Sequence, residues 1–488
     1  MISFVISIFI LIFGYLVYSK IVARICGQDS SRITPVYLLA DGVDYVELPS
    51  WKIFLIQFLN IAGLGPIFGA IMGVMFGPAA FLWIVFGTVF AGAVHDYLSG
   101  LMSIRQNGAS LPEIVGSQLG GKLKNIMRGF SLMLMLLVGA VFVYNPADLL
   151  ARMTPERLDV AFWVVTIFLY YVLATLLPID KLIGKLYPLF GFALLFMALG
   201  ICVMLCINHS MVPEVWEGFY NHKSNADSNP IFPMMFVSIA CGAISGFHAT
   251  QSPMMARCLR NESHARPIFY GAMVAEGCVA LIWAAAAIAF TGGYDNLQEY
   301  IGGSSPAVLV DNLSRTWLGK FGGILAILGV IAAPITSGDT ALRSARLIAA
   351  DFMNMKQGTI LKRLAVSVPL FAICFVIMLL PYDALWRYFA WCNQVLAVFT
   401  LWTGTIWLAS QNKNYYISLL PALFMTTVTI SYIIFAPEGL QTLMNELFNV
   451  EIPYVFAVGC GVAFSVIFLL LFQRYIATKR QQISLGIN

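Results

Sequence analysis

Three carboxylic acids stand within or at the end of long hydrophobic segments, where acidic side chains are rare. They are Asp96, Glu276 and Asp339. A carboxylate inside a membrane costs roughly 3 kcal/mol or more, so it usually faces a cavity, pairs with another group or binds a proton. His95 and His248 occur near the same segments, and histidine titrates near neutral pH. These five residues are therefore candidates for carrying protons or coupling ions.

The same residues also have structural interpretations. Asp96 could pair with Arg105, and Asp339 lies four residues before Arg343, a spacing that suits an ion pair on one helix face. His95 and Asp96 are adjacent, so we expect them to point to different helix faces and not to act as one dyad. The sequence leaves both a coupling role and a structural role open.

Two hydrophobic segments contain glycine or proline in their middle. Residues 61–66 read Ile-Ala-Gly-Leu-Gly-Pro, and residues 240–248 read Ala-Cys-Gly-Ala-Ile-Ser-Gly-Phe-His. Such residues release backbone groups that lipid cannot satisfy, so a break is stable only where it lines a cavity or contacts protein. The alternative for either segment alone is close helix packing, because Gly242 and Gly246 have the GxxxG spacing.

The relation between the two segments favours a binding site. They are five spans apart and so run in opposite directions, which is typical of two inverted five-helix repeats, each led by a broken helix. In such folds the ends of half-helices offer N–H groups to an anion, and the released carbonyls bind cations. We therefore expect a substrate site built from Ala62, Gly63, Gly65, Gly242, Ser245, Gly246 and His248.

A third interruption is expected at residues 333–340, where Pro334 is followed by hydroxyl side chains. Proline removes one backbone hydrogen bond, and nearby hydroxyls can replace it. This segment would be the eighth helix of a ten-helix core, and in the LeuT-like architecture that helix supplies hydroxyl ligands for sodium. By this analogy of fold, Thr336 and Ser337 would be such ligands.

Two coupling ions therefore stay open. A sodium site would combine Thr336 and Ser337 with carbonyls near Ile61 and Ala62. A proton-coupled protein would use the hydroxyls only to join helices, and a carboxylate would carry the proton. The residues expected to take part in coupling are Thr336, Ser337, Asp339, Asp96 and His95.

The composition of the chain indicates that these candidate residues are carried by membrane-spanning helices. The chain has 488 residues, of which 60% are hydrophobic and 11% charged, whereas soluble domains have about 45–50% and about 25%. Runs of about 17–25 apolar residues mark about 13 transmembrane helices. These runs are 1–18, 52–76, 79–102, 126–145, 159–178, 186–207, 231–250, 269–291, 321–340, 361–380, 384–408, 416–436 and 454–474.

We predict an all-α polytopic membrane protein with a LeuT-like core of two inverted five-helix repeats and extra helices at both ends. Its regions are 1–51, an N-terminal helix and cytoplasmic loop; 52–207, the first repeat; 208–409, the second repeat; and 410–488, two C-terminal helices and a tail. Most of the 28 Lys and Arg residues fall in alternate loops. This bias predicts an external N-terminus and a cytoplasmic C-terminus.

No motif for catalysis or a cofactor is recognised. The chain has no Walker loop and no HExxH string, and Ser245 near His248 lacks a third catalytic member. The nine cysteines include no CxxC pair, so we expect them to be buried small hydrophobic residues. We therefore expect no enzyme, no cofactor and no nucleic-acid partner.

Five strings of residues, in order along the chain, resemble those of one membrane-protein family. They are Asp-Gly-Val-Asp-Tyr at 41–45, Ile-Ala-Gly-Leu-Gly-Pro at 61–66, Gly-Ala-Val-His-Asp at 92–96, Cys-Gly-Ala-Ile-Ser-Gly-Phe-His at 241–248 and Ile-Thr-Ser-Gly-Asp-Thr-Ala-Leu-Arg at 335–343. Together they resemble the short branch of the carbon starvation protein A (CstA) family. Beyond about residue 350 the likeness depends mostly on hydropathy.

The resemblance implies an inner-membrane transporter used during starvation. Members of the family are associated with peptide uptake, and some relatives take up pyruvate with protons. Two departures flank the expected site: Gln57 stands where the family commonly has histidine, and residues 251–254 stand where it has a Ser-Gly-Thr-Thr-like string. These departures leave both the substrate and the coupling ion open.

The function that we expect is secondary active import of a small carboxylate-bearing nutrient, a short peptide or a pyruvate-like acid, coupled to protons or sodium. The alternative is a membrane nutrient sensor that binds the same solute without net transport. In either case the partners are the solute, the ion and the lipid bilayer.

Overall fold

The computed structural model describes residues 1–176, 179–207, 212–355, 357–380 and 382–484, and all regular structure within them is helical. The first half contains α1 Ile2–Phe13, η1 Gly14–Tyr18, α2 Ser19–Ile25, α3 Pro35–Leu38, α4 Ser50–Ile61, η2 Gly65–Gly69, α5 Ala70–Val74, α6 Ala79–Leu82, η3 Trp83–Gly92, α7 Ala93–Arg105, α8 Leu111–Leu119, α9 Gly121–Met153, α10 Val160–Leu176 and α11 Ile179–Ile207. The second half contains η4 Ile231–Met235, α12 Phe236–Ser238, α13 Gly246–Ala256, η5 Glu262–His264, η6 Arg266–Tyr270, α14 Gly271–Thr291, α15 Tyr294–Gly303, α16 Pro306–Ala326, η7 Ile327–Ile331, α17 Ala332–Phe352, α18 Ile360–Ile377, α19 Tyr382–Ser410, α20 Tyr416–Phe435, η8 Pro437–Gln441, α21 Thr442–Phe448 and α22 Tyr454–Ser484.

The number of continuous spans is lower than expected. In the described residues nine helices are long and apolar enough to cross a membrane, or up to 11 if each of two bent pairs is one span. The other two expected spans are 159–178 and 231–250. The first contains the shorter apolar helix Val160–Ala174, and the second is divided between α12 and α13. By length and composition the described residues thus give 9–11 candidate spans, against about 13 expected.

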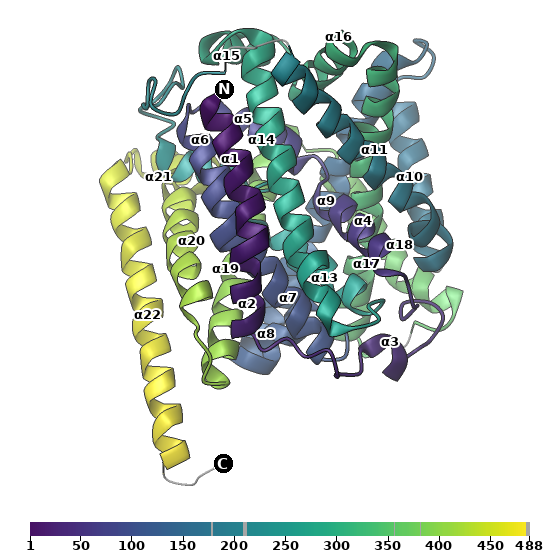
Figure 1. Cartoon of the computed structure of the whole chain (residues 1–488), viewed down its shortest axis with the longest axis vertical. Helices are drawn as coiled ribbons and strands as arrows, with labels where there is room; N and C mark the ends of the chain where they lie inside the picture. Colours follow the sequence, from purple (N-terminus) through teal and green to yellow (C-terminus); the bar gives the residue numbers. More distant parts are fainter. Residues whose placement is uncertain (177–178, 208–211, 356, 381, 485–488) are drawn as a thin grey trace.

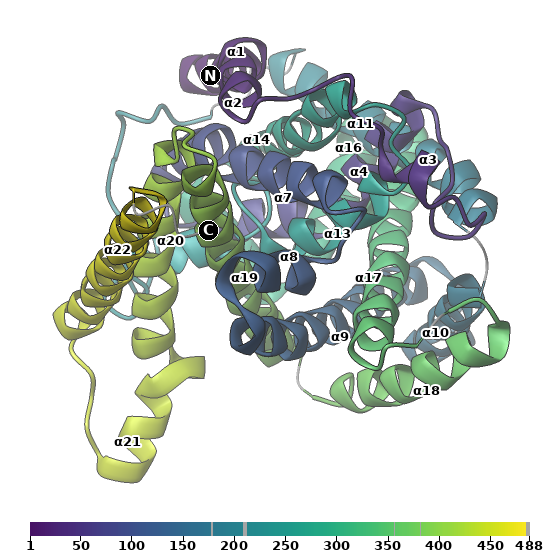
Figure 2. The ribbon, with the colours of Figure 1, turned by 90° about the horizontal axis from the view of Figure 1, so that it is seen from below.

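The helices form one bundle with a buried centre and a lipid-facing periphery. In α19, 83% of the apolar window is buried, whereas in α22 only 22% is. Figures 1 and 2 show α22 and α20 at one edge of the bundle, α10 and α18 at the opposite edge, and α4, α7 and α13 between them. Side chains on the central helices are thus shielded from lipid.

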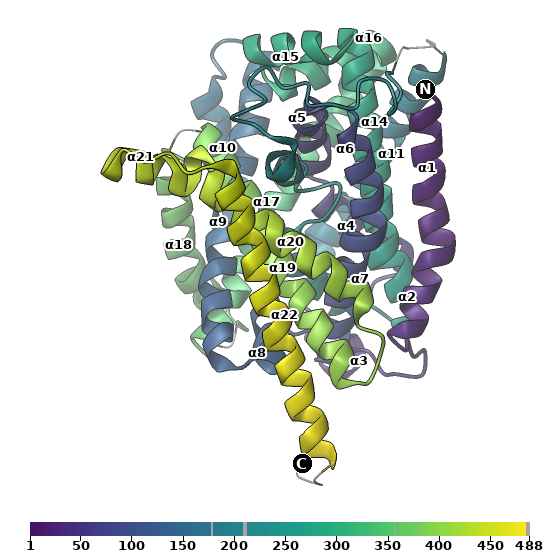
Figure 3. The ribbon, with the colours of Figure 1, turned by 90° about the vertical axis from the view of Figure 1, so that its left-hand side faces the viewer.

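The two ends of the chain lie at opposite ends of the bundle. Figures 1 and 3 show α1 starting at the end of the bundle that carries α15 and α16, whereas α22 extends beyond the opposite end, which carries α3 and α8.

The first predicted helix break is present. Helix α4 ends at Ile61, and the chain continues at an angle of 53° in the segment Gly65–Val74. Ala62, the residue after α4, has a non-helical ψ of 46°. Gly63, Gly65 and Pro66 therefore lie in or directly after an irregular turn within a buried span, as the sequence indicated.

The second predicted break is also present, but the third is not. Residues 239–245 are non-helical between α12 and α13. Residues 333–340, in contrast, belong to the continuous helix α17. Pro334 lies in its first turn, where a missing N–H has little cost. The bend in this span lies earlier, where Pro306–Leu325 and Leu328–Phe352 meet at 59°.

Candidate functional site

The two helix breaks contact each other. A Cβ atom added to Gly65 would overlap the side chain of Cys241, and one added to Gly69 would lie 2.9 Å from the main-chain oxygen of Ser238. Gly242 has a φ of +93°, which L-residues with side chains rarely adopt. Glycine is thus required at Gly65 by the close approach and at Gly242 by the backbone conformation.

Side chains from neighbouring helices satisfy the released backbone groups of the second break. Thr88 donates to the main-chain oxygen of Gly242 at 2.9 Å, and Gln394 donates to that of Ile244 at 3.1 Å. The N–H of Phe247 donates to Asn393 Oδ1 at 2.6 Å. The break is therefore stable within the bundle because α19 and η3 replace the missing helical hydrogen bonds.

A fully buried cluster of ionisable groups adjoins this break. His95, Asp96, His248 and Glu276 each have 0% exposure. Asp96 contacts Nδ1 of His95 through Oδ1 at 2.7 Å and Nδ1 of His248 through Oδ2 at 2.9 Å. Nε2 of His248 in turn lies 3.4 Å from Oε2 of Glu276.

Two expectations about Asp96 were wrong. His95 and Asp96 do form a pair, because the side chains of adjacent residues curl back toward each other here. Arg105 does not supply the partner of Asp96 but forms an ion pair with Glu262 at 2.6 Å. Arg105 follows Asp96 by nine residues on α7, which places it about two and a half helical turns away along the axis.

A second buried group lies on α17. Ser337 donates from Oγ to the main-chain oxygen of Leu59 in the last turn of α4, at 3.1 Å. Thr336 instead donates to Ala333 in its own helix at 2.8 Å. Asp339 accepts a hydrogen bond from the Tyr187 hydroxyl through Oδ2, and its Oδ1 has no hydrogen-bond partner among the described residues.

The expected site residues thus fall into two groups on either side of the α4 break. Cys241, against Gly65, adjoins the first group, which holds Gly242, Ser245, Gly246, His248, Asp96 and His95. The second group holds Thr336, Ser337 and Asp339. A Cβ on Gly63 would lie 3.2 Å from Ser337 Oγ, so Ala62 and Gly63 adjoin the second group. The expected sodium ligands Ile61 and Ala62 follow Leu59 directly in the chain.

Sequence reasoning missed Asn393, Gln394 and Tyr187. Asn393 and Gln394 are fully buried in α19, and Asn393 Oδ1 also accepts a hydrogen bond from Ser245 at 3.0 Å. The signal that could have revealed them was two consecutive amides within an apolar span, the same rule that selected the carboxylates. Tyr187 gave no such signal, because tyrosine is common in membrane helices.

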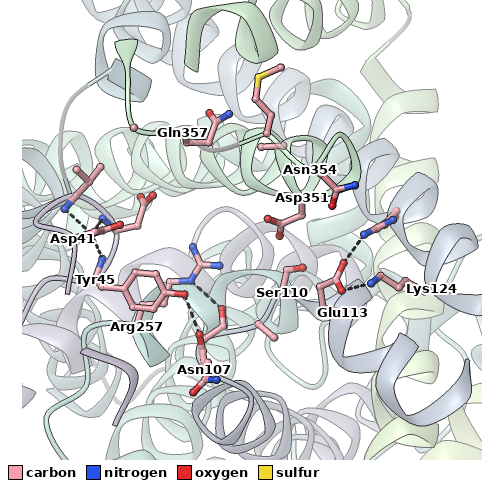
Figure 4. A pocket seen from close by; sticks show the side chains of 18 residues that line it. Asp41, Tyr45, Asn107, Ser110, Glu113, Lys124, Arg257, Asp351, Asn354 and Gln357 are labelled. Carbon is pink, nitrogen blue, oxygen red and sulfur yellow. Dashed lines mark hydrogen bonds and ion pairs between the residues drawn. The ribbon is translucent and has the colours of Figure 1, made fainter. Parts of the chain in front are cut away.

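A polar cavity of about 780 Å³ opens near α8, and none of the expected site residues line it. Figure 4 shows Asp41, Tyr45 and Arg257 on one side and Glu113, Lys124 and Asp351 on the other. Helix α13 carries His248 and ends directly before Arg257, which lines the cavity. Helix α17 carries both Ser337 and Asp351, and Asp351 lines the cavity. We call this cavity the vestibule.

Glu113 joins α8 to α9 at the wall of the vestibule. It forms ion pairs with Lys124 and with Arg128, the latter at 2.7 Å. Burial would raise the pKa of Glu113, but hydrogen bonds from Lys124 and Arg128 outweigh burial and hold the pKa below its usual value.

Comparison with known proteins identifies related sequences. The family model described as carbon starvation protein CstA matches residues 1–158, 153–314 and 305–432. An uncharacterized membrane protein of Haemophilus influenzae is 42% identical over 349 residues, which cover 62% of this chain and 94% of that protein.

Two named transporters are more distant relatives. The peptide transporter CstA of Campylobacter jejuni is 26% identical over 57% of this chain and 48% of its own length. The pyruvate/proton symporter BtsT of Escherichia coli is 27% identical over 57% of this chain and 47% of its own length. The match thus spans about half the length of each named transporter.

Solved structures show the same fold at low sequence identity. A manganese transporter mutant of Eremococcus coleocola superposes with a TM-score of 0.52 at 16% identity, covering 89% of this chain and 99% of that one. MhsT in complex with L-phenylalanine gives 0.53 at 13% identity, covering 88% and 98%. The helical bundle therefore has the LeuT-like transporter fold.

Proposed function

Because the chain belongs to the carbon starvation protein CstA family, we propose that it imports a small carboxylate-bearing nutrient, a short peptide or a pyruvate-like acid, by secondary active transport coupled to protons or sodium. The observation that carries this proposal is the contact between the two helix breaks at Gly65 and Cys241. In transporters built from inverted repeats, broken helices meet at the substrate site. The repeats here would be residues 52–207 and 208–409.

The substrate carboxylate would bind at the α4 break, between the two groups of buried polar residues. Ala62 and Gly63 lie in this irregular turn, and Gly65 begins the following half-helix, whose N–H groups favour an anion. Across the contact, Gly242, Ser245, Gly246 and His248 would form the opposite wall. The two named relatives support a solute of this class.

Coupling would occur on α17. Ser337 lies beside the α4 break, and Asp339 keeps one carboxylate oxygen without a hydrogen bond in the described part of the chain. Ser337, Thr336 and main-chain oxygens near Ile61 and Ala62 would bind sodium. If the ion is a proton, Asp339 would carry it.

The vestibule would be the cytoplasmic exit. Under the predicted orientation, with the N-terminus outside and the C-terminus inside the inner membrane, the end of the bundle near α3 and α8 faces the cytoplasm. Both α13 and α17 reach from the site residues to this cavity. The protein would serve uptake when carbon is scarce.

Uptake into proteoliposomes tests the proposal. Labelled pyruvate and labelled dipeptides are offered separately under an imposed proton gradient and under an imposed sodium gradient. We expect one solute class to accumulate above protein-free liposomes, and only with one of the gradients. If a folded, monodisperse protein accumulates neither class with either gradient, the transport proposal is wrong.

A further inference from the structure

Three side chains that commonly bind metals converge beside the second helix break. Cys241 Sγ, a ring nitrogen of His248 and a carboxylate oxygen of Glu276 all lie within 4.8 Å of one another. Cys241 belongs to the break, His248 to α13 and Glu276 to α14, and all three are buried. The fold therefore brings together three potential metal ligands, a sulfur, a nitrogen and an oxygen atom, from three separate elements.

In the part of the chain that the structure describes, the atoms of His248 and Glu276 that could bind a metal are left without hydrogen bonds. Nε2 of His248 and both carboxylate oxygens of Glu276 have no hydrogen-bond partner among the described residues. The separation of 3.4 Å between Nε2 and Oε2 is long for an N–H···O hydrogen bond. It is close to the spacing of about 3.3 Å between two ligands that are each about 2.0–2.1 Å from a tetrahedral ion.

Neighbouring groups hold two of the donors in the orientation that a metal ion needs. Asp96 accepts from Nδ1 of His248 at 2.9 Å, which leaves the lone pair on Nε2 directed toward Glu276. A carboxylate behind a histidine in this way is typical of metal ligands. Asn393 donates from Nδ2 to Cys241 Sγ at 3.4 Å, an interaction that stabilises a thiolate.

We propose that Cys241, His248 and Glu276 bind one divalent transition-metal ion of zinc-like softness. A thiolate and a carboxylate would balance the two positive charges of the ion inside the bundle. A mixed sulfur, nitrogen and oxygen set disfavours calcium and magnesium, which prefer oxygen ligands. Three protein donors leave a fourth tetrahedral position for water or for a solute carboxylate.

This proposal goes beyond the proposed transport function and is tested without transport. The purified full-length chain is stripped with a chelator and equilibrated with Co²⁺ or Zn²⁺ alone. We expect one ion per chain by elemental analysis, with the visible spectrum of tetrahedral cobalt and a thiolate-to-cobalt charge-transfer band. Metal binding without solute uptake would leave the site in place and contradict only the transport proposal.

Substitutions then identify the ligands. Cys241→Ser should remove the charge-transfer band, and Glu276→Gln should weaken binding while keeping that band. Asp96→Asn, which alters the group behind the His248 imidazole and the contact with His95 but none of the three ligands, should weaken binding about 10–100-fold. Cys374→Ser is the matched control, because Cys374 is equally buried but lies against Leu136. Each variant is first checked for a cooperative thermal transition.

Two outcomes would overturn the metal site. One is a parent protein that retains no more cobalt or zinc than Cys241→Ser. The other is a cobalt spectrum that is the same in the parent and in Cys241→Ser. Either result would mean that His248 and Glu276 interact only with each other and with Asp96.

Discussion

The hydroxyl of Ser337 donates a hydrogen bond to the main-chain oxygen of Leu59 at 3.1 Å. This contact joins α17 to the last turn of α4, directly before the chain breaks. A carbonyl at the end of a helix has no intrahelical partner, so Ser337 occupies a position that a cation could share. The neighbouring Thr336, the other hydroxyl proposed to bind sodium, donates within its own helix, so its hydrogen bond does not join the two helices.

Ser337→Ala should therefore reduce uptake more than Thr336→Ala does. Loss of one buried hydrogen bond costs about 0.5–1.5 kcal/mol, or roughly a 2–10-fold change. If sodium is the coupling ion, the double variant should also lose the sodium dependence of uptake at fixed pH. If Ser337→Ala and Thr336→Ala reduce uptake equally, the hydrogen bond from Ser337 to Leu59 has no special importance for uptake.

Asp339→Asn should abolish uptake driven by a pH gradient if the ion is a proton, because the amide cannot carry one. Tyr187→Phe should reduce uptake less severely, since it keeps the carboxyl group and removes the hydroxyl that donates to Oδ2 of Asp339 and to the main-chain oxygen of Thr336. Hydrogen bonds to charged groups contribute about 1.5–3 kcal/mol. Asp311→Asn, on α16, is the control. If uptake driven by a pH gradient survives in Asp339→Asn, a group other than Asp339 carries the proton.

Gly65→Ala should destabilise the protein, because its Cβ would overlap the side chain of Cys241. Overpacking of a buried contact typically costs about 1–3 kcal/mol, so the Tm in detergent should fall. Gly129→Ala, in α9, has nothing within 4 Å of its Cβ and should leave the Tm unchanged or slightly higher. A Gly65→Ala protein with the parent Tm would show that the breaks do not touch.

Glu113 should make stability depend on pH in the acid range. Its pKa is held below the usual value in the folded protein, so its contribution is full above the ordinary glutamate pKa of about 4.3 and is lost as pH falls through the lower folded value. The charged groups around it are Lys124, Arg128 and Asp351.

The measurement is the Tm in detergent across this pH range. Glu113→Gln should flatten the decline below about pH 4.3, whereas Glu446→Gln, at an exposed position on α21, should not. An unchanged slope in Glu113→Gln would assign the acid sensitivity to other groups.

The sequence predicted the breaks because glycine and proline act locally. Gly65, Pro66 and Gly242 lie in short mid-span strings rich in glycine or proline, which weaken a helix locally, so the positions of the breaks could be predicted from the sequence. Pro334 shows the limit of the same rule, because a proline in a first turn leaves the helix intact. Whether a proline begins or breaks a helix depends on where the preceding helix bends.

The buried cluster could be predicted only as separate residues. Asp96 and His248 are 152 positions apart in the chain, and no local pattern indicates that they meet. Periodicity placed His95 and Asp96 on different faces, but side-chain torsions brought their polar atoms within 2.7 Å. The role of Asn393 as partner of Ser245 and Phe247 likewise depends on the packing of α19 against the break.

The turn after α4 touches Ser337 through Gly63 and Cys241 through Gly65. Any displacement of this turn changes distances in both groups at the same time. If an ion binds beside Ser337 and a ligand binds at the Cys241 side, thermodynamic linkage makes the effect reciprocal. The ion would alter affinity for the ligand by the same factor by which the ligand alters affinity for the ion. Stoichiometric co-transport would need this mutual dependence, and Gly63 and Gly65 would supply it because they let one turn approach both groups closely.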